Sequence, residues 1–384
     1  MSNQPLTDFN VQGRPKTLAE VKLWMKDRLQ KRVHPLNMLD SDEGPLLIDS
    51  LTGLDGAAWA AVWLKAGNTV VEQAKGAEAS GDKELASALY MKASGLYFLG
   101  RFPCPNHPDK ERCAGLERET YLAASRSWKE PIRRIAIPFA GRSDEGTEVI
   151  GYLRKPVGIK SPPLVIMWGG VDAWKEQMTA ACNAFLAKGV ATLALDNAGT
   201  GESPVKGVVD AERQFLAALD WAAEQEDLQG DRVALLGRSF GGYWATKLAH
   251  TAASKIAAAV NWGGGAHYMF ERSWVEASRY PDSYLMELVE TRCRMLGATS
   301  DEEYIAGFKQ LSLLDQGLLD LPSAPLLLVN GKHDRQCPIE DIQLLLDHGS
   351  PKSVRLFPGG HMGNTPQTLP TIVDWVVKHL GVTK

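Results

Sequence analysis

The sequence predicts an α/β protein in which a mostly parallel β-sheet, with helices on both faces, follows a helical N-terminal domain. Three observations support this prediction. Apolar residues recur at helical spacing from Thr17 to about Arg126, short apolar runs bounded by Gly or Pro begin after Pro131, and helical stretches separate most of those runs. We therefore expect a helical domain over residues 1–130 and an α/β domain over residues 131–384.

Helical periodicity is clearest at three places in the first third of the chain. Leu18, Val21, Leu23 and Trp24 form one apolar face, and the stretch from Trp59 to Val71 forms a second. A third helix is predicted from Asp82 to about Leu99, with Gly81-Asp82 as its start signal and Gly100 as its stop signal.

Short β-type runs dominate the rest of the chain. Ile132–Phe139 and Glu148–Leu153 flank the polar turn GRSDEGT and predict an antiparallel hairpin. Further strands are predicted at Leu164–Trp168, Val190–Leu195, Val233–Leu236, Ala257–Trp262, Leu326–Val329 and Val354–Phe357, with helices such as Ala211–Glu224 and Tyr243–Ala253 between them. This alternation is typical of a parallel sheet covered on both faces. The helical, aromatic-rich interval of about 265–321 interrupts it, and we expect a cap inserted over the carboxyl edge of the sheet.

Composition excludes several functional classes. The 384 residues have 44% hydrophobic and 23% charged side chains, a balance typical of globular proteins, and a formal net charge of -4, which favours neither nucleic acid nor an anionic membrane. The five cysteines are scattered, and Cys104 and Cys113 bracket His107 at a spacing that matches no common zinc module. The first residues contain no apolar core segment, so we expect no secretory signal, and no apolar run approaches the roughly 20 residues needed to span a bilayer. We expect a soluble, cytoplasmic protein without a metal or a cofactor.

The strongest motif is Gly237-Arg238-Ser239-Phe240-Gly241, which fits G-x-S-x-G between an apolar strand and a helical stretch. In that context the small residues permit a sharp turn that exposes the serine hydroxyl at a helix N-terminus. The alternative is a glycine-rich turn with an idle serine. We interpret Ser239 as a nucleophile.

A serine hydroxyl needs a base, and a base needs an orienting acid. Asp334 ends the apolar run of PLLLVNGKHD, and His361 ends SVRLFPGGH, so the order along the chain is Ser, Asp, His. That order is typical of the α/β-hydrolase fold, which we therefore predict. His333 lies on the same loop as Asp334, too close to be its partner base, and Asp315 and Asp320 are expected in the cap.

An oxyanion hole requires two N–H donors. We expect the first from Phe240, immediately after the nucleophile. The second should come from the loop Gly169-Gly170-Val171-Asp172, where glycine permits close approach of the backbone. Val171 is the first choice and Gly170 the second.

The combination GGVDAWKEQ, DNAGTGES, LGRSFGGYWATKLA and NWGG, after a helical prefix that contains GDKELASALYMKASGLYFLGRFPCPNHP, resembles one branch of the α/β hydrolases. The branch comprises the FrsA-like esterases and relatives of 2,6-dihydroxypseudooxynicotine hydrolase, which cleaves a carbon–carbon bond. The resemblance covers most of the chain and implies a homodimer. It also implies an assisting glutamate some thirty residues past the nucleophile. Glu271 lies in that region, although a solvated carboxylate is an equal alternative, and His267 and Trp262 are further candidates for the substrate pocket.

We therefore predict a serine hydrolase that cleaves a carboxylic ester of a small or medium, apolar or aromatic substrate. A carbon–carbon bond hydrolase acting on a diketone or aryl ketone is the first alternative, and carbamates and amides would use the same triad. A non-catalytic binding or regulatory protein on a hydrolase scaffold is the alternative from another class.

Overall fold

The computed structural model describes residues 13–348 and 352–382, and these residues divide into two compact units. Of the described residues, one unit comprises 13–132 together with Tyr284–Thr291, and the other comprises Arg133–Ser283 and those from Arg292 onward. No helix among the described residues is both long and apolar enough to cross a membrane.

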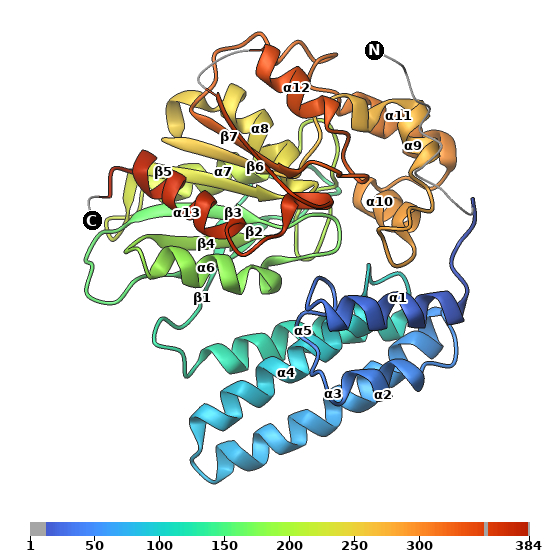
Figure 1. The fold of residues 1–384 in the computed structure, drawn as a ribbon. Coiled ribbons are helices and arrows are strands. Elements are labelled where there is room, and N and C mark those ends of the chain that lie inside the picture. Colours follow the sequence, from blue (N-terminus) through green and yellow to red (C-terminus); the bar gives the residue numbers. More distant parts are fainter. Residues whose placement is uncertain (1–12, 349–351, 383–384) are drawn as a thin grey trace. The chain divides into compact units, whose positions relative to one another are not determined.

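The first unit is helical (Figure 1). Side-chain caps mark where its helices begin. Thr17 and Glu20 form a capping box at the first helix, and the carboxylates of Asp55 and Asp82 each accept a hydrogen bond from a backbone N–H of the first turn of the helix that follows. The helices are α1 (Leu18–Gln30), α2 (Gly44–Asp49), α3 (Gly56–Ala79), α4 (Lys83–Arg101) and α5 (Pro108–Ser125).

The sequence pattern predicts that α4 stops at Gly100, but the helix continues to Arg101. A Cβ atom at Gly100 would lie 2.4 Å from the sulfur of Cys113 on α5. The glycine therefore permits close packing of two helices and does not serve as a C-cap.

The second unit contains an eight-stranded sheet in the order β1-β2-β4-β3-β5-β6-β7-β8. The pairs β1–β2 and β2–β4 are antiparallel and all the others are parallel. This arrangement confirms the predicted α/β-hydrolase fold, including its N-terminal hairpin. The strands are β1 (Arg133–Pro138), β2 (Glu148–Arg154), β3 (Pro163–Trp168), β4 (Ala191–Leu195), β5 (Gln229–Arg238), β6 (Ala258–Trp262), β7 (Leu326–Gly331) and β8 (Lys352–Phe357).

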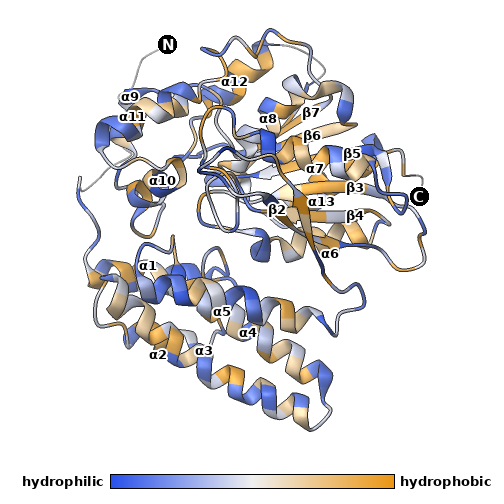
Figure 2. Cartoon of the chain, turned by 180° about the vertical axis from the view of Figure 1, so that it is seen from behind, coloured by the Kyte–Doolittle hydropathy of each residue, from blue (hydrophilic) through white to orange (hydrophobic). Residues whose placement is uncertain are grey.

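Helices cover both faces of the sheet, with α6 and α13 on one face and α7 and α8 on the other (Figure 1). Because both faces are covered, every residue of β3, β4, β6 and β7 is buried, and these strands are strongly hydrophobic in Figure 2. Outside the interval of about 265–321, the helices of this unit are η2 (Lys175–Met178), α6 (Thr179–Leu186), α7 (Arg213–Ala223), α8 (Gly241–Thr251), η3 (Ala253–Lys255), α12 (Glu340–Asp347), η5 (His361–Gly363) and α13 (Thr368–His379).

The interval of about 265–321 contains η4 (Tyr268–Phe270), α9 (Arg272–Ala277), α10 (Leu288–Leu296) and α11 (Asp301–Gln310). It is helical as predicted, but Tyr284–Thr291 groups with the helical unit. The reason is local packing: Glu287 forms an ion pair of 2.6 Å with Lys110, and the ring centroid of Tyr284 lies 6.0 Å from that of Phe102.

Candidate active site

Ser239 occupies a strained turn between β5, which ends at Arg238, and α8, which begins at Gly241. Its φ angle is 55°, a left-handed backbone conformation that residues other than glycine rarely adopt. The backbone N–H of Ser239 donates to the carbonyl of Trp262 at 2.7 Å and so ties the turn to the end of β6. Strain of this kind at a serine between a strand and a helix is typical of a nucleophile elbow.

The glycines of the motif are required by close backbone contacts. A Cβ at Gly237 would lie 2.0 Å from the carbonyl oxygen of Gly241, and a Cβ at Gly241 would lie 2.2 Å from that of Gly169. A Cβ at Gly170 would lie 2.8 Å from the Cβ of Ser239. The turn and the loop after β3 can therefore approach each other only because these positions lack side chains.

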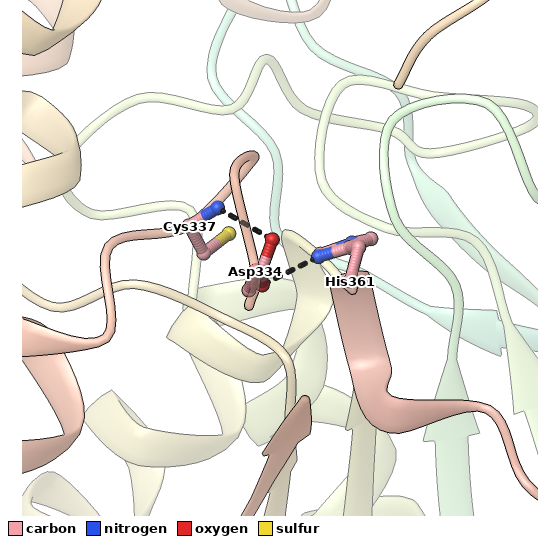
Figure 3. Close-up of side chains that lie close together, drawn as sticks. All are labelled: Asp334, Cys337 and His361. Atoms are coloured by element: carbon pink, nitrogen blue, oxygen red, sulfur yellow. Dashed lines mark hydrogen bonds and ion pairs between the residues drawn. The ribbon is translucent and has the colours of Figure 1, made fainter. Parts of the chain in front are cut away.

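His361 and Asp334, from the loops after β8 and β7, come together with Ser239. The hydroxyl Oγ of Ser239 lies 2.7 Å from Nε2 of His361. Nδ1 of His361 lies 2.8 Å from Oδ2 of Asp334, a contact drawn in Figure 3. The two hydrogen bonds use different nitrogens of one imidazole. This arrangement can carry a proton from the hydroxyl to the ring while the carboxylate holds the ring orientation.

The carboxylate of Asp334 is fully buried and its oxygens accept several hydrogen bonds. Besides His361, its donors are Nδ2 of Asn330 at 2.8 Å and the backbone N–H groups of Gln336 at 2.7 Å and Cys337 at 3.2 Å. A buried charge is tolerated where such donors replace water. The carboxylate of Asp334 is thus fixed in place by groups of the protein itself.

Asn330 is a functional candidate that the sequence reasoning missed. Its Nδ2 donates to Asp334, and its Oδ1 accepts from the backbone N–H of Met362 at 2.8 Å, next to His361. One buried amide therefore joins the loop of Asp334 to the loop of His361. The available signal was a polar residue at the end of the otherwise apolar run LLLVN.

Two of the predicted oxyanion donors, Phe240 and Gly170, lie beside Ser239. Phe240 is at the N-terminus of α8, and Gly170 and Val171 follow β3. No described residue accepts a hydrogen bond from the backbone N–H of Phe240 or Val171, although both residues are buried. Buried N–H groups rarely lack an acceptor, so both can donate to a ligand oxygen.

A buried ion cluster anchors the segment that follows Val171. The ammonium of Lys175 is fully buried and lies 2.6 Å from Oδ2 of Asp196 and 2.8 Å from Oε2 of Glu202. Tyr152 donates to Glu176 at 2.9 Å. Burial by itself would lower the pKa of Lys175, but Asp196, Glu176 and Glu202 together raise it above its ordinary value. The candidate oxyanion loop is therefore tied to the end of β4 by charge.

Glu271 and His267 have partners of their own. Oε1 of Glu271 accepts from the ammonium of Lys309 at 2.6 Å and lies 3.6 Å from Nε2 of His267. Nδ1 of His267 lies 2.7 Å from the hydroxyl of Ser312. The structure therefore does not join either residue to the Ser239–His361–Asp334 group by a hydrogen bond or an ion pair among the described residues.

Trp262, the last residue of β6, lies closer to the site. Its indole N–H donates to the carbonyl of Met362 at 2.7 Å, directly after His361. Trp262 thus supports the histidine loop from the end of β6, two strands away from β8 in the sheet.

Cys337 is a buried neighbour of Asp334 and His361 (Figure 3). Its Sγ atom, a carboxylate oxygen of Asp334 and a ring nitrogen of His361 all lie within 4.8 Å of one another. Burial, aided by the charge of Asp334, raises the pKa of the Cys337 thiol well above its ordinary value. The thiol is therefore protonated at neutral pH and is a poor nucleophile.

Comparison with known proteins places the chain in a family. The family model described as "Esterase FrsA-like" matches residues 29–381. The chain is 27% identical to Esterase FrsA of Enterobacter sp. (strain 638) over 340 residues, 87% of this chain and 80% of the relative. It is 26% identical to Esterase FrsA of Escherichia coli (strain K12) over 339 residues, again 87% and 80% of the two chains.

Two solved structures share the fold along most of their length. The 2,6-dihydroxy-pseudo-oxynicotine hydrolase superposes with a TM-score of 0.73 and 22% identity, covering 93% of this chain and 95% of that one. Wild-type AbyA5 superposes with a TM-score of 0.74 and 20% identity, covering 94% of each chain.

Proposed function

Because the chain belongs to the FrsA-like esterase family, we propose that this hydrolase cleaves carboxylic esters with Ser239 as its nucleophile. One observation carries the proposal. The 2.7 Å contact from Ser239 to His361 and the 2.8 Å contact from His361 to Asp334 form a continuous chain of hydrogen bonds that ends on a strained, glycine-flanked turn. The family match supports the reaction class, and the geometry supports the residues.

In the proposed mechanism the hydroxyl oxygen of Ser239 attacks the carbonyl carbon while Nε2 of His361 takes the hydroxyl proton. The backbone N–H groups of Phe240 and Val171 donate to the oxyanion, and Asp334 stabilises the imidazolium. His361 then protonates the alkoxide as it leaves. The same base activates a water molecule, which releases the acid and restores the serine.

The carbon–carbon alternative is less well supported. A carbanion leaving group needs an acid to protonate it, and Glu271 was the residue expected to assist. Its carboxylate instead pairs with Lys309 and is 37% exposed. We therefore propose ester cleavage, in a small-molecule substrate, as the main activity. The homodimer and the cytoplasmic location remain predictions.

The test uses p-nitrophenyl acetate and a fluorophosphonate probe with the wild-type protein, Ser239→Ala and the control Ser254→Ala, which changes an exposed serine. We expect labelling of Ser239 and ester turnover in the wild type and the control, and loss of both in Ser239→Ala. Labelling that persists in Ser239→Ala would exclude Ser239 as the nucleophile. A wild-type protein that is neither labelled nor active would favour the binding-protein alternative.

A further inference from the structure

The charged side chain of Arg238, the residue immediately before Ser239, differs in its contacts from the other buried arginines. Its side chain is partly buried, yet its guanidinium forms no hydrogen bond and no ion pair with any described residue. Its recorded ring contact is with Trp262, whose centroid lies 5.8 Å from the guanidinium carbon. Other buried arginines of this protein are bonded: Arg101 pairs with Glu117, and Arg292 donates to the hydroxyls of Ser278 and Tyr304.

An arginine without a protein acceptor is costly at such a position. The guanidinium carries five N–H donors and stays charged at physiological pH, so partial burial removes water that no protein group replaces. Burial lowers the pKa of Arg238, and the carboxylate of Asp172 opposes that effect from beyond ion-pair distance. The charge is therefore only partly compensated, and an incoming anion can compensate it further.

The position of Arg238 connects it with the proposed chemistry. It ends β5 and lies in register with Trp262, the last residue of β6, whose indole N–H contacts the loop of His361. Asp172 directly follows Val171, a predicted oxyanion donor. The guanidinium is thus flanked by the same strand ends and loops that carry the nucleophile, the base and the oxyanion donor.

We propose that Arg238 forms a carboxylate-binding subsite, so that the ester substrate carries a second, ionised carboxyl group. This inference rests on the proposed function, because it names the substrate class of the same site. A guanidinium binds a planar carboxylate through two parallel N–H···O bonds. The negative charge of Asp172 nearby favours a ligand with a single charge over a phosphate dianion, since like charges repel across a site partly shielded from water.

The experiment compares two matched esters, 4-acetoxybenzoate and 4-acetoxybenzamide, which differ only in the charge of one group. Values of kcat/KM, corrected for the hydroxide-catalysed rates, are measured for wild type, Arg238→Gln and the control Arg355→Gln, which removes an exposed arginine. We expect the wild type and the control to prefer the carboxylate about tenfold to hundredfold, the range of a charge-assisted bond. The preference should fall below about twofold in Arg238→Gln.

The ratio of the two esters is the critical measurement, because structural damage would lower both rates and leave their ratio unchanged. A wild-type ratio near one, or a ratio that survives in Arg238→Gln, would overturn the subsite. Binding of 4-hydroxybenzoate and 4-hydroxybenzamide, followed by tryptophan fluorescence, separates this proposal from the proposed function. Arg238-dependent binding of the carboxylate in a protein that cleaves neither ester would support the subsite and refute the esterase. Turnover of 4-acetoxybenzamide without any preference for the carboxylate would support the esterase and refute the subsite.

Discussion

Replacing Asn330 by alanine tests whether the proposed triad depends on the amide that joins its two loops. The substitution removes the 2.8 Å bond from Nδ2 to Asp334 and the 2.8 Å bond from Met362 to Oδ1. Asp334 keeps its two backbone donors and His361, so we expect the carboxylate to stay ionised but to hold the imidazole less firmly. The variant keeps the carboxylate, and what changes is how firmly that carboxylate orients the imidazole.

The expected magnitude follows from the bonds that are lost. A hydrogen bond to a charged group contributes about 1.5–3 kcal/mol. Each 1.36 kcal/mol in the activation free energy is about tenfold in rate, so kcat should fall by about 10- to 100-fold if most of that energy orients the base. KM should change less than about twofold, since the contacts recorded for Asn330 are with the enzyme's own loops. Asn330→Asp should lose more activity, because a second carboxylate would face Asp334.

The assay is steady-state hydrolysis of p-nitrophenyl acetate, with thermal unfolding of each variant to confirm that it folds. Asn68→Ala is the matched control, because it deletes an asparagine that accepts a 2.7 Å bond from Tyr97 in the helical unit. The control should lose stability at most and keep its kcat. An Asn330→Ala variant with wild-type kcat, or one that raises KM alone, would refute the orienting role.

Three further substitutions test the charges of the α/β unit. Lys175→Met should lower the Tm by roughly 6–12 °C, because breaking a buried ion pair costs about 3–5 kcal/mol and leaves Asp196 uncompensated; a Tm within 2 °C of wild type would contradict the anchoring role. Lys352→Met should stabilise the protein by about 1 kcal/mol at pH 7, a figure reduced for solvent screening of the half-buried amine. Burial lowers the pKa of Lys352 from 10.5 to about 8, so the free-energy cost of its buried charge is present below pH 8 and disappears above pH 10.5. Urea unfolding at pH 7 and pH 10.5 should therefore show that the extra stability of Lys352→Met shrinks as the pH rises. Extra stability that grows with pH would refute the assignment. Glu271→Ala should change the kcat for ester hydrolysis by less than about twofold, because a surface ion pair such as that with Lys309 contributes about 0–1 kcal/mol; a tenfold loss would restore Glu271 as an assisting residue.

Periodicity was sufficient for the architecture, because the spacing of apolar residues reflects which faces an element buries. Each predicted strand is present in the structure, although β5 extends well beyond Val233–Leu236 to Gln229–Arg238. The pattern identified the apolar centre of that strand. It did not identify the polar ends, where Gln229 pairs with Pro163 of β3 and Arg238 pairs with Trp262 of β6.

Local sequence was also sufficient to nominate Ser239, Asp334 and His361, since each follows an apolar run and their order matches one fold. It could not find Asn330, or the lack of a protein acceptor at Arg238, because neither property is local. A side chain's partners depend on which loops the register of the sheet brings together, and Ser239 and His361 are 122 residues apart. Gly100 shows the same limit, because its close approach to Cys113 on α5 is a tertiary contact that the local sequence does not reveal. The sequence alone therefore determined the elements and the candidate reactive groups, whereas the tertiary structure decided which of the described side chains are paired and left Arg238 without a hydrogen-bonded partner among them.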